Sequence, residues 1–126
     1  MSFDLTTKQL DLKARARDLA AGIIANNAAE VDRSEQYPWD NVKALKEAGF
    51  MGMTIPTELG GPGLNFLDAN LVVEEMASYC GPTGRIAVEA NMGAISAVVH
   101  YGTETQKRLA ADLFLDGDKP AICITE

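Results

Sequence analysis

Apolar side chains recur about once per helical turn through the first quarter of the chain, at Leu10, Ala14, Ala21 and Ile24. This spacing is the period of an amphipathic α-helix. Thr6 and Gln9 stand three residues apart ahead of the pattern and fit a capping box, the reciprocal side-chain motif that begins a helix. The pattern predicts one long helix over residues 6–33, weakened locally at Gly22 and followed by a break over residues 34–38.

Four further helices are predicted from the same period, over residues 39–48, 66–79, 83–100 and 103–117. Residues 83–100 are apolar on most faces of the helix, which favours a central position in the fold. In the last of these helices, four residues are predicted to face inward: Leu109, Ala110, Leu113 and Phe114.

The last six residues, 121–126, read as a β-strand. A single strand has no partner for its hydrogen-bond ladder, so it is either an edge or part of a larger sheet. The pattern as a whole therefore predicts an all-α fold that ends in one strand.

Composition and charge narrow the class of protein. Apolar residues make up 47% of the 126 residues, and the formal net charge is −7. No basic patch interrupts this acidic balance, which argues against nucleic acid and anionic membranes as partners. No apolar run approaches the roughly 20 residues of a membrane helix, and nothing at the N-terminus resembles a signal peptide. A cytoplasmic protein is the default expectation.

Few residues offer chemistry by themselves. The cysteines Cys80 and Cys123 show no metal-ligand spacing, and with the single histidine, His100, they cannot build a zinc site. The glycine-rich segment 60–63 lacks the preceding strand and the following Lys-Ser/Thr of a phosphate loop, so a structural turn is the favoured interpretation.

Arg85 and Glu89 stand four residues apart on the most apolar predicted helix. One interpretation is an ordinary ion pair between successive turns, worth a few tenths of a kcal/mol. The other is that Arg85 lines a pocket and receives an anion through its planar fork. The pattern alone favours the ion pair.

Taken in order, several segments resemble the acyl-CoA dehydrogenase superfamily over essentially the whole chain. They are the residues around Ile55-Pro56 and Gly60-Gly61-Pro62-Gly63, then Val73-Glu74-Glu75-Met76-Ala77, then Glu89-Ala90-Asn91, then Tyr101-Gly102-Thr103 with Gln106, and finally Ile122-Cys123-Ile124-Thr125-Glu126. The resemblance implies an N-terminal helical domain over residues 1–118, with residues 119–126 beginning a β-barrel domain.

The resemblance also implies FAD as cofactor, an acyl-CoA substrate and a homotetramer. It places Ile122, Ile124 and Thr125 at the flavin. It places the fourth predicted helix, with Arg85, Glu89 and Asn91, along the substrate's acyl pocket. The resemblance implies that the family's catalytic base lies beyond residue 126, so residues 1–126 hold no candidate for it.

Other segments are similar to the desulfinase branch of that superfamily, among them Ser34–Val42, Gly84-Arg85-Ile86 and Gly117–Ile124. That branch acts on 3-sulfinopropionyl-CoA (also written 3-sulfinopropanoyl-CoA) and releases sulfite without an external electron acceptor. The resemblance implies that Arg85 faces the acidic end of a short acyl chain. Two alternatives stay open: an ordinary short-chain α,β-dehydrogenase and a non-catalytic helical interaction module.

Overall fold

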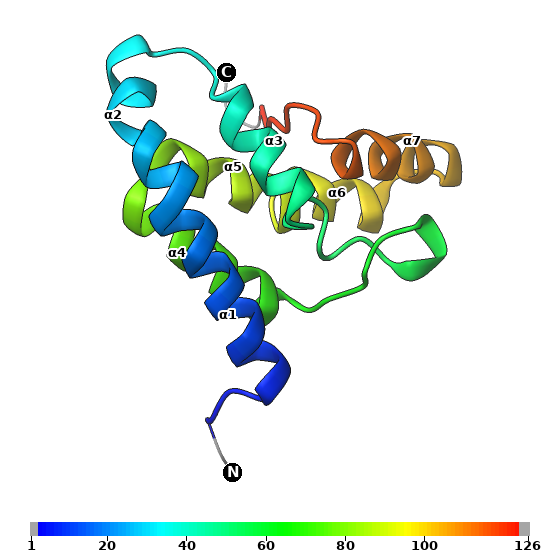
Figure 1. Ribbon diagram of the computed structural model, residues 1–126. Coiled ribbons are helices and arrows are strands. Elements are labelled where there is room, and N and C mark those ends of the chain that lie inside the picture. Colours follow the sequence, from blue (N-terminus) through cyan, green and yellow to red (C-terminus); the bar gives the residue numbers. More distant parts are fainter. Residues whose placement is uncertain (1–2, 124–126) are drawn as a thin grey trace.

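The computed structural model describes residues 3–123 (Figure 1). Within this range the chain is helical, with no strand assigned. Its elements, in order, are α1 (Thr7–Leu19), a π-helical segment η1 (Ala20–Ile24), α2 (Ala25–Ser34), α3 (Trp39–Glu47), a 3₁₀ turn η2 (Thr57–Leu59), α4 (Phe66–Tyr79), α5 (Gly81–Asn91), α6 (Ala94–Tyr101) and α7 (Glu104–Leu115).

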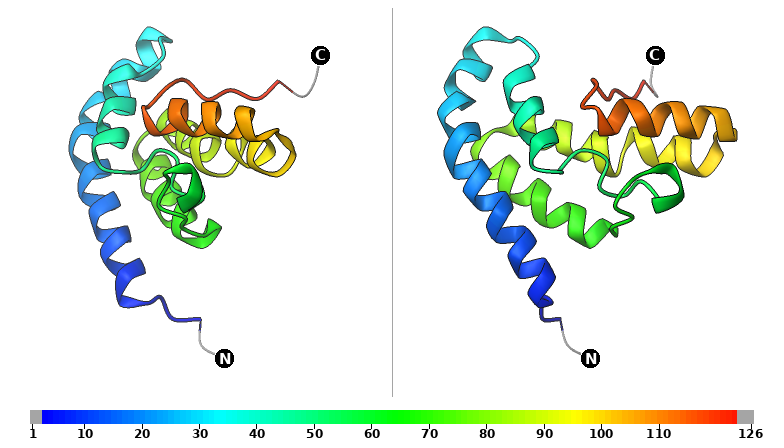
Figure 2. Two further views of the ribbon diagram at one scale, coloured as in Figure 1. Left: turned by 90° about the vertical axis from the view of Figure 1, so that its right-hand side faces the viewer. Right: turned by 45° about the vertical axis from the view of Figure 1, so that its right-hand side comes forward.

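The first predicted helix is present as the run of α1, η1 and α2, which is kinked at Gly22 and lies along one side of the molecule (Figure 2). The Thr6 hydroxyl accepts from the Gln9 N–H, so the predicted capping box is present. Gly22 has φ −90° and ψ −105°, outside the helical region, and lies in the π segment. The local weakness predicted at this glycine is therefore a kink within the π-helical segment.

Helices α4 and α5 form the centre of the fold. Helix α4 packs mainly against α1 and α5, and its bounds match the prediction over residues 66–79. The two helices approach closely at Gly84, where a Cβ atom would lie 2.6 Å from the Cβ of Ala77. The main core joins α1, α3, α4 and α5, with Ile24, Leu45 and Met76 wholly buried.

The prediction of one helix over residues 83–100 is wrong. The structure has two helices there, α5 and α6, separated at Met92 and Gly93. Met92 has φ −134° and Gly93 has ψ −102°, and neither residue continues the helix. The central position holds for α5 only, because α6 buries one side chain fully, that of Ile95.

Helix α7 begins at the predicted capping box of Thr103 and Gln106. The prediction of its inward face is partly wrong, because the side chains of Leu109 and Leu113 are 60% and 43% exposed. They face an open apolar groove of about 490 Å³ between α6 and α7. The smaller Ala111 takes the buried position instead.

The glycine-rich segment 60–63 is a turn in which backbone N–H groups donate hydrogen bonds within the same loop. The N–H groups of Gly61 and Gly63 donate to the carbonyl oxygens of Pro56 and Ile55. These donors therefore serve the loop itself, as the structural-turn interpretation requires. In the described part of the chain, no helix combines the length and the apolar character needed to cross a bilayer.

Candidate functional site

A groove opens where the turn between α2 and α3 meets the start of α5 and the segment after α7. Its volume is about 400 Å³, and its lining includes Glu35, Tyr37, Pro38, Pro82, Arg85 and Lys119. These residues come from three parts of the chain that only the fold brings together. The charged side chains that line the groove are Arg85, Lys119 and Glu35.

Arg85 lies on α5 with its side chain 66% exposed at this groove. Its Nη2 atom pairs with Oε1 of Glu89, one turn further along the helix. The ion pair that the spacing predicts is therefore present. The remaining Nε and Nη1 groups have no partner among the described residues, so the guanidinium can still donate to an anion.

Glu89 is the buried partner, with its side chain 8% exposed. Its Oε2 accepts a hydrogen bond from the N–H of Ala94 at 3.2 Å, which places a carboxylate at the start of α6. A negative charge is favourable at a helix N-terminus. A Cβ on Gly93 would lie 2.3 Å from the same oxygen, so a larger residue here would displace the Glu89 carboxylate. Glu89 thus links Arg85 to the break between α5 and α6.

Asn91 is wholly buried, and its side chain binds backbone groups. Its Oδ1 accepts from the N–H of Met53 at 2.6 Å, and its Nδ2 donates to the carbonyls of Phe50 and Ala87 at 2.8 and 2.9 Å. Both amide donors are used within the chain. The structure thus places Asn91 under the loop after α3, where it holds α5 against that loop; substrate contact by Asn91 stays a prediction.

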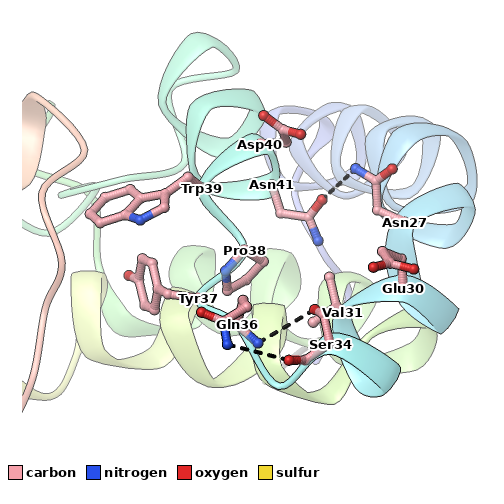
Figure 3. Close-up of a pocket in the computed structure, with 10 residues that line it drawn as sticks. All are labelled: Asn27, Glu30, Val31, Ser34, Gln36, Tyr37, Pro38, Trp39, Asp40 and Asn41. Carbon is pink, nitrogen blue, oxygen red and sulfur yellow. Dashed lines mark hydrogen bonds between the residues drawn. The ribbon is translucent and has the colours of Figure 1, made fainter.

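A second pocket, of about 260 Å³, lies on the α2 side of the same turn (Figure 3). Asn27 donates to Asn41 Oδ1 at 2.8 Å, and Asn41 Nδ2 donates to the Thr83 hydroxyl at 2.8 Å. Thr83 in turn donates to Cys80 Sγ at 3.1 Å. This chain of hydrogen bonds, buried from Asn41 onward, ties α2, α3 and α5 together, and it was not predicted from the sequence.

Tyr37 lies between the two pockets and lines both. Its ring makes an edge contact with Trp39, with centroids 4.6 Å apart, and Lys119 Nζ lies 4.7 Å from its centroid. The Tyr37 hydroxyl oxygen is buried and has no hydrogen-bond partner among the described residues. Burial raises the pKa of this hydroxyl to about 12, and the Asp118 carboxylate adds to the shift.

Neither Tyr37 nor Lys119 was predicted as a site residue, although both lie in segments similar to the desulfinase branch. Lys119 stands 82 positions beyond Tyr37, and nothing in the local pattern connects them. A signal did exist for Asn41, which stands four residues before the buried Leu45 and so falls on the inward face of α3. A polar residue in that register needs a buried partner.

The three residues predicted at the flavin are only partly described. Ile122 is 39% exposed, in a segment over residues 121–123 that is neither helix nor strand. Ile124 and Thr125 lie outside the described residues. The strand over 121–126 and the domain boundary at 118 therefore stay predictions.

Comparison with known proteins gives matches over most of the chain. The family model "Acyl-CoA dehydrogenase, N-terminal domain" matches residues 6–117. A 3-sulfinopropanoyl-CoA desulfinase of Variovorax paradoxus is 61% identical over 98% of this chain and 31% of its own length. A short-chain specific acyl-CoA dehydrogenase of Clostridium acetobutylicum is 35% identical over 86% of this chain and 28% of its own length.

Comparison with solved structures agrees with the sequence matches. A solved chain of butyryl-CoA dehydrogenase from Megasphaera elsdenii superimposes with a TM-score of 0.80 at 26% identity. The match covers 93% of this chain and 31% of that one. This chain thus spans about a third of the length of the relatives that it matches.

Proposed function

This chain belongs to the acyl-CoA dehydrogenase family as an N-terminal domain, and on that premise we propose that the protein carrying it is an FAD-dependent 3-sulfinopropanoyl-CoA desulfinase. The 61% identity to a desulfinase, against 35% to a short-chain dehydrogenase, supports this choice over ordinary dehydrogenation. A cytoplasmic homotetramer is part of the same proposal and rests on the family resemblance.

The observation that carries the proposal is Arg85 at the groove. A sulfinate or carboxylate at the end of a short acyl chain is a planar or pyramidal anion with two oxygens, which suits a guanidinium fork. Arg85 keeps two donor groups free for this purpose, while Glu89 holds the third. Glu89 acts as a positioning residue, because it is buried and anchored to the start of α6.

The residues of this chain proposed at the flavin are Ile122, Ile124 and Thr125. The exposed side chain of Ile122 leaves apolar surface available to a flavin ring. When bound, FAD supplies the electron-accepting chemistry of this family. The role of this helical domain is to bind and orient the substrate and to shield one wall of the site from water.

The overall reaction balances without an external oxidant. The C–S bond breaks, the sulfinate group takes a hydroxyl from water and leaves as hydrogensulfite, and the carbon that carried sulfur gains the remaining proton. The product would be propanoyl-CoA. A dehydrogenase, in contrast, must pass two electrons from each substrate to an acceptor.

The test is a product assay on the flavin-loaded protein that carries this sequence. With 3-sulfinopropanoyl-CoA and no electron acceptor, we expect one sulfite released for each substrate consumed, measured with a thiol-exchange dye. Butyryl-CoA with an artificial acceptor is the parallel assay for dehydrogenation. Acceptor-dependent oxidation of butyryl-CoA without sulfite release, or a protein that binds no FAD, would overturn the proposal.

A further inference from the structure

The Tyr37 hydroxyl is a polar group left without a partner in the interior. Its oxygen is buried and accepts or donates no hydrogen bond among the described residues. A hydroxyl in this state costs on the order of 1–3 kcal/mol relative to one that is paired. Folded proteins satisfy nearly all such groups, so an unpaired one needs a reason.

Two cationic side chains, those of Arg85 and Lys119, line the same groove as Tyr37. The Tyr37 ring lines the groove of Arg85, and the ammonium of Lys119 lies over it, 4.7 Å from the centroid. Glu35 also lines the groove, and Asp118 lies close enough to affect the hydroxyl. The phenol is protonated at neutral pH even at its ordinary pKa of about 10, so it is available as a donor.

Lys119 contacts the Tyr37 ring from an exposed position. It is an exposed residue on a flexible four-carbon stem, and its charge contacts the face of an aromatic ring. A cation–π contact at such a site is worth only about 0.5–1 kcal/mol. An anion in the groove can therefore draw the ammonium away from the ring, which also uncovers the ring of Tyr37.

We propose that Tyr37 and Lys119 complete the anion site of Arg85 as specificity-determining residues for an acyl-CoA with an acidic end. The Tyr37 hydroxyl donates a hydrogen bond to one anionic oxygen, the Arg85 fork donates to the other, and Lys119 balances the charge. This assignment rests on the proposed function and deepens it, because it names the groups that distinguish an acidic acyl chain from a neutral one.

The test compares Tyr37→Phe and Lys119→Gln with the wild-type flavoenzyme. The probes are succinyl-CoA, which ends in a carboxylate, and butyryl-CoA, a neutral chain of the same carbon number; dissociation constants come from titration calorimetry. We expect each variant to bind succinyl-CoA roughly tenfold more weakly, because Tyr37→Phe removes a hydrogen bond to a charged group and Lys119→Gln removes a balancing charge. Butyryl-CoA affinity should change less than about twofold, and a Tyr101→Phe control should change neither.

Thermal unfolding without ligand separates binding from structure. Removing an unsatisfied buried hydroxyl should leave the melting temperature of Tyr37→Phe equal to or above that of wild type. A lower melting temperature would show that the hydroxyl is already satisfied, and would overturn the inference. If wild type prefers succinyl-CoA and both variants keep that preference, the inference alone is wrong. If wild type binds both probes equally, the proposed function is wrong as well.

Discussion

Gly84 tests how closely α5 must approach α4, because an added methyl group has no room there. In Gly84→Ala the new Cβ would lie 2.6 Å from the Cβ and 2.7 Å from the Cα of Ala77. Carbon atoms in contact normally lie about 3.5–4.0 Å apart, so the helices must separate by about 1 Å. The obstruction includes backbone and cannot be relieved by a rotamer change.

The magnitude follows from two opposing effects. Overpacking of this kind costs about 1–3 kcal/mol, and backbone overlap places Gly84→Ala at the upper end. The gain in helix propensity from glycine to alanine offsets at most about 1 kcal/mol. We therefore expect a net loss of about 2 kcal/mol in the free energy of unfolding, which lowers the urea midpoint by about 1 M at a typical slope for a small protein.

Gly81 provides a matched control on the same helix, because a Cβ there would meet nothing within 4 Å. Gly81→Ala should shift the unfolding free energy by less than about 0.5 kcal/mol. Urea unfolding followed by the fluorescence of Trp39, the one tryptophan of the 126-residue sequence, measures both variants. Equal midpoints for the two variants would refute the close-approach argument.

Two further changes test the interior and the surface. Asn91→Ala leaves the N–H of Met53 and the carbonyl of Phe50 unpaired, so it should cost about 2–5 kcal/mol in urea unfolding; the exposed Asn70→Ala should cost under 0.5 kcal/mol, and similar losses would contradict the assigned role. The hydrogen bond and charge of Lys46 hold the pKa of the Asp116 carboxyl below its usual range, so its stabilisation is present above the ordinary carboxyl pKa and is lost as pH falls through the lowered value. As the pH falls from about 5 to about 2, the melting temperature should therefore decrease less in Asp116→Asn than in wild type. Equal decreases in the two proteins would disprove the coupling between Lys46 and Asp116.

The parts of the fold that could be predicted from sequence are those decided by local chemistry. Thr6 and Thr103 each cap a helix through a residue three positions later, and both capping boxes are present. The bounds of α4 were likewise readable, because its apolar period ends at Cys80 ahead of a glycine and a proline.

The break between α5 and α6 has a different origin. Glu89 binds the N–H of Ala94, and Asn91 binds Met53 and Phe50 in a distant loop. These contacts depend on tertiary structure, and the sequence around residue 92 continues an apolar helical pattern. The prediction from local periodicity therefore merged two helices that long-range polar contacts separate.

The candidate site also combines residues that could be predicted from the sequence with residues that could not. Arg85 and Glu89 could be found because they are one helical turn apart, and their ion pair is present. Tyr37 and Lys119 could not, because only the fold brings residues 37 and 119 into contact. The exposure of Leu109 and Leu113 was also missed, since a helical period shows which residues share a face but not what covers that face.

An Arg85 variant needs a background in which Glu89 is not left as a buried carboxylate without a cation. In Arg85→Ala alone, the Glu89 carboxylate would stay buried without its cation, which is strongly destabilising. Glu89→Gln removes that charge and keeps an oxygen for the N–H of Ala94. The comparison is therefore Arg85→Ala/Glu89→Gln against Glu89→Gln, with the exposed Arg108→Ala as a control for general loss of positive charge.

The central claim is that Arg85 recognises the acidic end of a short acyl-CoA, and kcat/KM for sulfite release from 3-sulfinopropanoyl-CoA tests it most directly. In the Glu89→Gln background, removing Arg85 should lower kcat/KM by about 100-fold, as expected for loss of a charge-assisted pair worth roughly 3 kcal/mol. Affinity for butyryl-CoA should change less than about twofold. Equal losses for the acidic and the neutral acyl-CoA, or no loss for either, would contradict the account.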